Sequence, residues 1–162
     1  MSKSAKKEIR RGPPVIENRR ARHNYEIMET VEAGIALLGT EVKSLREGRA
    51  NLQDAYAVPM QNELVLLNCH IQPYSHGNAF NHEETRSRKL LLKRREINSL
   101  ASKVKEKQLT LVPLKMYFND RGKVKVLLGL GRGKKLHDKR ESEKKNEARK
   151  EIDRAMKDHS RN

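Results

Sequence analysis

One stretch of strict alternation in the second half of the chain constrains its fold more than any other feature. Apolar side chains occupy every even position from Val124 to Leu130, and the lysines Lys123 and Lys125 alternate with the first of them. A two-residue period is typical of a β-strand with one buried face. An apolar run over residues 109–118 precedes it, and the turn-forming sequence Asn119-Asp120-Arg121-Gly122 separates the two. The chain is therefore predicted to contain a β-hairpin over residues 109–130.

The rest of the sequence predicts further short strands and two helices. Apolar residues at alternate positions predict a strand over residues 25–37, and the spacing from Ile97 to Val104 predicts an amphipathic helix over residues 94–107. The other expected elements are a short helix that starts at Gly39-Thr40 and ends at Gly48, strands over residues 54–60 and 63–71 around Gln61-Asn62, and a loop over residues 72–85.

The size and composition of the chain allow one modest hydrophobic core. It has 162 residues, of which 35% are hydrophobic. The predicted fold is mainly β with α: a small OB-type β-barrel with two or three flanking helices. We expect a flexible basic N-terminus over residues 1–15, the barrel over residues 16–132, and a basic tail over residues 133–162. The tail has only a thin apolar stripe, so it is expected to be disordered when free and to order on binding.

Charge points to a polyanionic partner. The formal net charge is +15, and the excess lies in blocks at residues 1–22, 86–107 and 131–162, whereas residues 23–85 are net acidic. Such blocks indicate a surface that follows phosphates. A nucleic acid or a membrane surface could supply the anion, but no apolar run approaches the roughly 18 residues of a spanning helix, so nucleic acid is favoured. The absence of an apolar signal segment and the single cysteine, Cys69, lead us to expect a cytoplasmic protein.

Motifs for catalysis or for a cofactor are weak. Cys69, His70, His76 and His82 lack the paired spacing of a structural zinc site. The segment from Gly129 to Lys134 resembles a P-loop only faintly and is interpreted as a flexible hinge. No pattern of a nucleophile or of paired acid and base carboxylates is found, so we expect no enzyme activity, no metal and no cofactor.

Several ordered motifs resemble one known family. They are Asn18-Arg19-Arg20-Ala21-Arg22-His23, Glu32-Ala33-Gly34-Ile35-Ala36-Leu37, Gly39-Thr40-Glu41-Val42-Lys43-Ser44-Leu45-Arg46, Arg88-Lys89-Leu90-Leu91-Leu92, Lys123-Val124-Lys125, Gly133-Lys134-Lys135 and His137-Asp138-Lys139-Arg140. Together they resemble the small protein B family, the transfer-messenger RNA binding proteins of bacterial trans-translation. The resemblance implies an OB-type barrel that holds the tRNA-like domain of that RNA and a tail that enters the ribosome.

The resemblance and the basic blocks together nominate the functional residues. The expected RNA-binding residues are Asn18, Arg19, Arg20, Arg22, His23, Glu32, Arg86, Arg88, Lys89, Leu91, Lys123 and Lys125. The expected ribosome-contacting residues of the tail are Gly133, Lys134, Lys135, His137, Asp138, Lys139, Arg140, Ile152 and Met156.

Some of these residues have ordinary alternative roles. The block from Asn18 to Arg22 could be a solvated charge run, although asparagine amides and arginine forks suit bases and phosphates. Glu32 lies opposite in parity to the apolar face of its strand and should point outward. Leu91 could belong to the core or contact RNA. His137 could be an ordinary tail histidine, but its ring could stack on a nucleobase.

The function expected from the resemblance is that of an adaptor. The barrel would hold the tRNA-like domain, and the tail would detect an empty mRNA channel at the decoding centre of a stalled ribosome. The expected partners are transfer-messenger RNA and the ribosome, with alanyl-tRNA synthetase and elongation factor Tu linked through the RNA, and the protein is expected to be a monomer. A structural ribosomal protein is the second hypothesis, and an RNA-modifying enzyme is a third.

Overall fold

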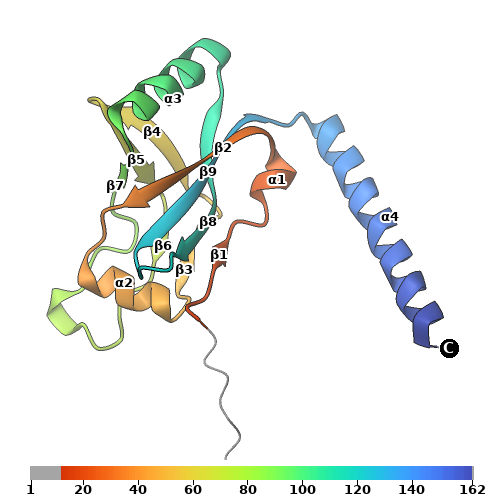
Figure 1. Cartoon of the computed structure of the whole chain (residues 1–162), viewed down its shortest axis with the longest axis horizontal. Coiled ribbons are helices and arrows are strands. Elements are labelled where there is room, and N and C mark those ends of the chain that lie inside the picture. The colour runs from red at the N-terminus through yellow and green to blue at the C-terminus, as the bar shows by residue number, and fades with distance from the viewer. Residues whose placement is uncertain (1–11, 162) are drawn as a thin grey trace, which may run out of the picture.

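The computed structural model describes residues 12–161, without the side chains of Asn78, Leu136, His137, Asp138 and Arg161. Residues 1–11, which make up most of the predicted basic N-terminus, lie outside the described residues. Figure 1 shows a barrel-like body from which a long C-terminal helix projects on one side.

The predicted hairpin is present, and its two strands pair where the sheet closes on itself. It consists of β8 (Thr110–Phe118) and β9 (Val124–Gly133), joined by a turn in which Gly122 has a φ of 75°. β9 also pairs along most of its length with β2 (Tyr25–Ile35), the strand predicted over residues 25–37. β9 therefore pairs with two strands, one on each side, and its alternating side chains face the same two sides of the sheet as theirs.

The sheet closes on itself because β9 has a partner on each side. Within the described residues, the seven-stranded sheet follows the order β1-β8-β4-β5-β7-β2-β9, and β8 additionally pairs with β9. The pairs are antiparallel. The resulting mixed α/β body, a near-barrel ring with flanking helices, confirms the coarse prediction. The remaining strands of the ring and its edge are β1 (Ile16–Glu17), β4 (Tyr56–Met60), β5 (Glu63–Leu67) and β7 (Arg88–Leu91).

The strand predicted over residues 63–71 is wrong in its second half. β5 ends at Leu67, and Asn68 has a φ of 56°, which an extended strand cannot accommodate. His70–Ile71 then form β6, which pairs with β3 (Ala50–Asn51) in a separate two-stranded sheet. The apolar run looked continuous because both strands bury side chains. The predicted turn at Gln61-Asn62 is confirmed, since both residues have positive φ, as a tight hairpin requires.

The glycine-rich segment from Gly129, predicted to be a flexible hinge, is instead the end of β9. A Cβ atom on Gly131 would lie 2.7 Å from the carbonyl oxygen of Glu26, and one on Gly129 would lie 3.1 Å from Cδ1 of Ile27. Glycine thus permits the close approach of β2 beside its irregular register at Ile27. These glycines are needed because β2 lies too close for a side chain, which only the paired strand reveals.

Helices cover the ends and one side of the ring (Figure 1). The two predicted helices are confirmed as α2 (Gly39–Arg46) and α3 (Arg94–Lys107), and α3 buries Ile97 and Leu100 against the core. Gly48 follows α2 with a φ of 73°, as expected for a helix end. Two helical elements were not predicted, α1 (Ala21–Asn24) and the 3-10 turn Asn78–Phe80, and neither were the short strands β1, β3 and β7. The C-terminal helix is α4 (Leu136–Arg161).

The core fills the interior of the ring. Six of its side chains are fully buried and come from β5, β7, β8 and β9: Leu64, Leu66, Leu90, Leu111, Val126 and Leu128. Burial of such side chains contributes roughly 1.5–3 kcal/mol each and is the main source of stability in a domain of this size.

A buried ion cluster ties α2 to β7 and to the preceding loop. The Glu41 carboxylate is fully buried and accepts hydrogen bonds from Arg86 and from Arg88. Arg88 is also fully buried, and its guanidinium donates to the carbonyl oxygens of Cys69 at 2.7 Å and Glu84 at 3.0 Å. Burial alone would raise the pKa of Glu41, but these hydrogen bonds and that from the Leu38 amide outweigh it and leave the pKa below its ordinary value.

The Glu41 cluster yields a prediction for stability. Replacing Glu41 with Gln should lower the free energy of unfolding by about 3–5 kcal/mol, because two guanidinium groups lose their buried counter-charge. Since the folded-state pKa of Glu41 lies below the ordinary 4.5, this contribution should be present above that pH and be lost as pH falls through the folded-state value. Urea denaturation at several pH values measures both effects.

The matched control is Glu63→Gln. Its carboxylate pairs with the Lys89 ammonium at 3.1 Å on the surface, with both side chains about half exposed, so it should cost less than about 1 kcal/mol. An equal loss of unfolding free energy in the two variants would contradict a special role of the buried cluster.

Candidate RNA-binding surface

Two cross-strand rows of side chains form an outer face on the ring. One row runs Lys115, Leu127 and Glu32 across β8, β9 and β2, and the second runs Tyr117, Lys125, Gly34 and Leu91 across β8, β9, β2 and β7. Directly paired residues project from the same side of an antiparallel sheet, and the intervening residues, such as Met116, Val126 and Ala33, are buried. We call these seven residues the outer face. Three predicted residues, Glu32, Lys125 and Leu91, are therefore brought together.

Tyr117 organises this face, although the sequence analysis did not nominate it. Its hydroxyl donates a hydrogen bond to the Glu32 carboxylate, and burial together with that carboxylate raises the pKa of Tyr117 to about 12. The Lys115 ammonium lies 5.2 Å from the centre of the Tyr117 ring. The sequence could have indicated that Tyr117 faces outward, since Lys115 and Tyr117 alternate with the apolar residues Leu114 and Met116, which are buried.

Glu32 and Leu91 are both exposed on the outer face. Glu32 is exposed, as its parity predicted. Leu91 is 49% exposed, so it is a surface residue rather than part of the core. It lies opposite Gly34, where a Cβ atom would be only 3.1 Å from that of Leu91, so the glycine keeps this part of the surface flat.

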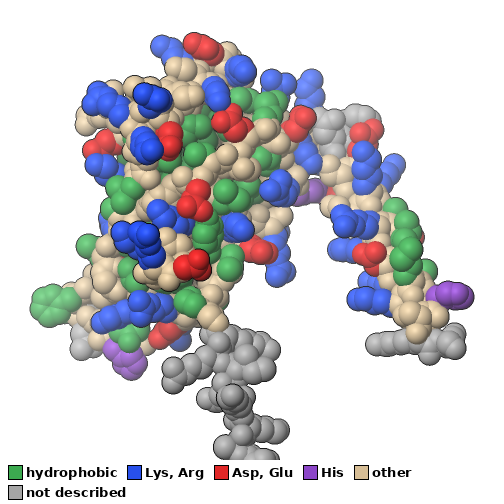
Figure 2. Space-filling model, viewed as in Figure 1, with side chains coloured by type: hydrophobic (Ala, Val, Ile, Leu, Met, Phe, Trp, Pro, Cys, Tyr) green, Lys and Arg blue, Asp and Glu red, His purple; other side chains and the backbone are tan. Residues whose placement is uncertain are grey.

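The basic block of residues 19–22, which leads into α1, adjoins one end of the outer face. Arg19, Arg20 and Arg22 are exposed, while the buried Ala21 packs against Val112 and Leu114 and fixes the segment on β8. Arg19 and Arg22 line, together with Lys115 and Leu127, a hollow of about 280 Å³. The arginines and the outer face thus form one continuous surface. Figure 2 shows Lys and Arg side chains spread over the body and along α4, with acidic side chains among them.

Asn18 has a structural task in addition to any functional one. It is 9% exposed, and its Nδ2 atom donates hydrogen bonds to the carbonyl oxygens of Leu52 at 3.1 Å and Pro113 at 2.9 Å. The amide nitrogen therefore ties the N-terminal segment to the barrel. A contact of Asn18 with RNA stays a prediction, and it would use the Oδ1 atom.

The predicted RNA-binding role of Arg88 is wrong. Its side chain is fully buried and its guanidinium is occupied by Glu41 and by backbone carbonyls, so it cannot reach a ligand. Arg86 is partly exposed but is also bound to Glu41. Lys89 is exposed on the same side of β7 as Leu91 and pairs with Glu63 at 3.1 Å. Lys123 is exposed beside the hairpin turn.

The root of the tail is attached to α1. The Lys134 amide donates to the Asn24 carbonyl at 2.9 Å, and its ammonium donates to the Ser142 hydroxyl at 2.8 Å. The Nε2 atom of His23 lies 3.3 Å from the Glu143 carboxylate, and the expected contact of His23 with RNA stays a prediction. These contacts join α4 to the body close to the end of β9.

The remaining tail residues lie along α4 and beside its start. Gly133 ends β9, Lys135 and Arg140 are exposed, and Lys139 is half-buried. The side chains of His137 and Asp138 lie outside the described residues. Ile152 is 56% and Met156 68% exposed, so the apolar stripe of α4 faces solvent. Ordering of the tail on binding stays a prediction.

The residues weighed as zinc ligands have other partners. Cys69 is buried and burial raises the pKa of its thiol to about 11. His70 pairs with Glu84, and His82 connects Thr40 at 2.9 Å with the Ile71 carbonyl at 2.8 Å. Among the described residues, no three His, Cys, Asp or Glu side chains are grouped so that they could hold a metal ion. No helix in the described part of the chain is long and apolar enough to cross a membrane.

Comparison with known proteins identifies the family. A family model described as SmpB protein matches residues 15–158. The SsrA-binding protein of Desulforamulus reducens is 57% identical over 144 residues, which are 89% of either chain, and that of Trichormus variabilis is 58% identical over 146 residues, 90% of this chain and 94% of the other. A solved structure described as "tmRNA-SmpB: a journey to the center of the bacterial ribosome" is 58% identical, covers 76% of this chain and 86% of its own, and superposes with a TM-score of 0.65. The chain belongs to the SmpB protein family.

Proposed function

We propose that this chain binds transfer-messenger RNA and brings it to stalled ribosomes in trans-translation. The relatives are called SsrA-binding proteins, and the similar solved structure concerns transfer-messenger RNA with SmpB in the bacterial ribosome. The observation that carries the proposal to particular residues is the outer face, with exposed arginines directly beside it. The family is one of RNA-binding proteins without enzymatic activity.

Each part of the surface suits one feature of RNA. The exposed Arg19 and Arg22 have the forked guanidinium that pairs with phosphate oxygens, and Lys115 adds a point charge next to them. Glu32, oriented by the Tyr117 hydroxyl, is an acceptor for a base amine or a 2′-hydroxyl. The exposed Leu91 beside Gly34 offers a flat apolar contact for a base or sugar.

The finer parts of the mechanism belong to the same proposal. The ring acts as an OB-type barrel that grips the tRNA-like domain, and α4 orders in the empty mRNA channel near the decoding centre. Lys135, Arg140, Ile152 and Met156 then face ribosomal RNA or protein. The protein acts as a monomer in the cytoplasm, where ribosomes translate, and alanyl-tRNA synthetase and elongation factor Tu reach it through the RNA.

The charge of the outer face predicts a salt effect. Replacing Lys115 and Lys125 together with Ala should weaken binding of transfer-messenger RNA and reduce the slope of log K against log salt by roughly 2, because two phosphate contacts are lost. Filter retention at several salt concentrations measures the slope. The control removes the same charge from α3 by replacing the exposed Lys105 and Lys107 with Ala. If both double variants change the slope equally, binding depends on net charge and not on this face.

The attachment of α4 at one point predicts that RNA binding and tail function can be separated. Replacing His137, Asp138 and Arg140 with Ala should leave most of the affinity for transfer-messenger RNA, since these residues are not part of the outer face. Alanine transfer from that RNA on ribosomes with truncated mRNA should nevertheless fall by at least about tenfold, through loss of stacking and phosphate contacts. The parental transfer rate in this variant would show that the segment is only a connector.

The alternative function, that of a structural ribosomal protein, is distinguished by stoichiometry, since a ribosomal protein would remain on all ribosomes in high salt.

A further inference from the structure

The loop over residues 72–85 is fixed to α2 near both of its ends. At its start, the Ser44 hydroxyl of α2 donates a hydrogen bond to the Gln72 carbonyl at 2.7 Å. Near its end, His82 is buried, and its Nδ1 atom lies 2.9 Å from the Thr40 hydroxyl of the same helix. We call residues 72–85 the aromatic loop. Figure 1 shows it projecting from the body beside α2, on the side away from α4.

Side chains inside the aromatic loop brace its middle. The Asn81 side chain accepts a hydrogen bond from the Tyr74 amide at 2.8 Å and donates one to the Tyr74 carbonyl at 2.7 Å. A Cβ atom on Gly77 would lie only 2.6 Å from the Nδ2 atom of Asn81, so the chain turns closely around this amide. The His76 ring packs edge-on against the Tyr74 ring, and the Lys43 ammonium of α2 lies 5.4 Å from the centre of the Tyr74 ring. The aromatic loop is therefore held from within as well as at its ends.

Phe80 is presented by this braced loop almost entirely to solvent. It is 91% exposed, more than any other large hydrophobic residue in the described part of the chain. It ends the 3-10 turn Asn78–Phe80, directly before the bracing Asn81. Loops that a rigid scaffold positions commonly carry the residues that contact partners, and aromatic side chains are frequent anchors of such contacts. Phe80 is therefore well placed to enter a pocket on a partner.

The charge of the aromatic loop differs from that of the chain as a whole. Residues 72–85 contain two glutamates and no lysine or arginine, whereas the chain has a net charge of +15. Glu83 is exposed and follows Phe80 closely in the chain. The Lys43 ammonium lies over Tyr74, which is half-buried near the start of the loop. A phosphate beside Phe80 would meet a carboxylate, so this ring suits a partner with positive charge.

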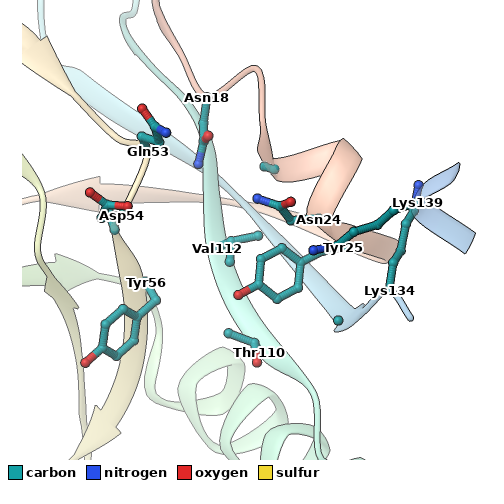
Figure 3. A pocket seen from close by; sticks show the side chains of 13 residues that line it. Asn18, Asn24, Tyr25, Gln53, Asp54, Tyr56, Thr110, Val112, Lys134 and Lys139 are labelled. Atoms are coloured by element: carbon teal, nitrogen blue, oxygen red, sulfur yellow. The ribbon is translucent and has the colours of Figure 1, made fainter. Parts of the chain in front are cut away.

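Other aromatic rings of the body have cations of the same surface beside them. The Lys115 ammonium lies 5.2 Å from the centre of the Tyr117 ring. Tyr25 lines a hollow together with Lys134 and Lys139, as Figure 3 shows. Rings that bind single-stranded nucleic acid generally lie in positively charged grooves. The aromatic loop has no lysine or arginine of its own, so it is better suited to a protein than to nucleic acid.

We propose that the aromatic loop docks on a basic protein of the ribosome, with Phe80 as the anchor in an apolar pocket and Glu83 beside a lysine or arginine at its rim. Protein interfaces are built in this way, from a few buried aromatic anchors inside a polar rim. Proteins that assemble on RNA are rich in lysine and arginine, so their surfaces complement Glu83. The inference rests on the proposed function, which brings the chain to the ribosome, and adds a protein contact to the proposed RNA contacts.

The first test removes the anchor from the full-length protein. The complex of Phe80→Ala with transfer-messenger RNA should bind ribosomes that carry truncated mRNA about 5- to 30-fold more weakly in a sedimentation assay, because the central side chain of the contact is lost. Its affinity for transfer-messenger RNA in filter retention should stay within about twofold, since the aromatic loop contains none of the residues of the outer face. The control Met60→Ala removes an apolar side chain that is 51% exposed at the end of β4, and it should change neither assay.

A charge reversal separates a protein partner from an RNA partner. Glu83→Lys should weaken binding to these ribosomes by about 3- to 10-fold, because it places like charges together in the proposed contact. If RNA lay against the loop, the same change would strengthen binding by adding a phosphate contact. The control Glu106→Lys changes the charge of an exposed glutamate on α3 by the same amount and measures the effect of net charge alone.

A cross-link identifies the partner without removing a ring from position 80. A photoreactive benzoyl-phenylalanine in place of Phe80 should cross-link, on these ribosomes, to one ribosomal protein. A cross-link to ribosomal RNA, to transfer-messenger RNA or to a second copy of this chain, or none at all, would overturn the proposal. So would unchanged ribosome binding by Phe80→Ala, or binding by Glu83→Lys that is at least as strong as that by Glu106→Lys. None of these outcomes touches the proposed function, which the salt dependence of the Lys115 and Lys125 variant tests separately.

Discussion

The structure depends above all on the pairing of β9 with two strands, β2 on one side and β8 on the other. This double pairing closes the sheet, and the pleat of β9 then assigns its side chains to two environments. Val126 and Leu128 enter the core, while Lys125 and Leu127 join the outer face. The same strand ends in glycines that let β2 approach and leads directly to the tail. The core, the outer face and the tail are therefore all positioned by one strand.

The buried Glu41 cluster has a different role, since it holds irregular chain rather than regular strands. Arg88 reaches from β7 to backbone carbonyls of the loop that precedes it, and Glu41 supplies the counter-charge from α2. Buried charges of this kind are stable only when each hydrogen bond is made, so they favour one loop conformation over others. Arg88 therefore stabilises the fold, although it lies in a basic motif that was expected to bind RNA.

Helix α1 lies between the proposed RNA-binding surface and the start of the tail. The outer face offers charge and a flat surface, which suit a folded RNA domain. The tail is attached to α1 through His23 and Lys134, so RNA held at the outer face as proposed would lie close to the start of the tail.

The sequence by itself determined the elements whose signal is local. The hairpin of β8 and β9, the helix α3 and the outward parity of Glu32 follow from periodicity, and the ordered motifs identified the family. Only the tertiary structure decided which polar residues are used inside the molecule. Arg88 meets Glu41 across 47 positions, Asn18 meets Pro113 across 95, and Gly131 is required by a strand about a hundred residues earlier. Such partners leave no periodic trace, because periodicity reports which face of an element is buried and not which group lies opposite it.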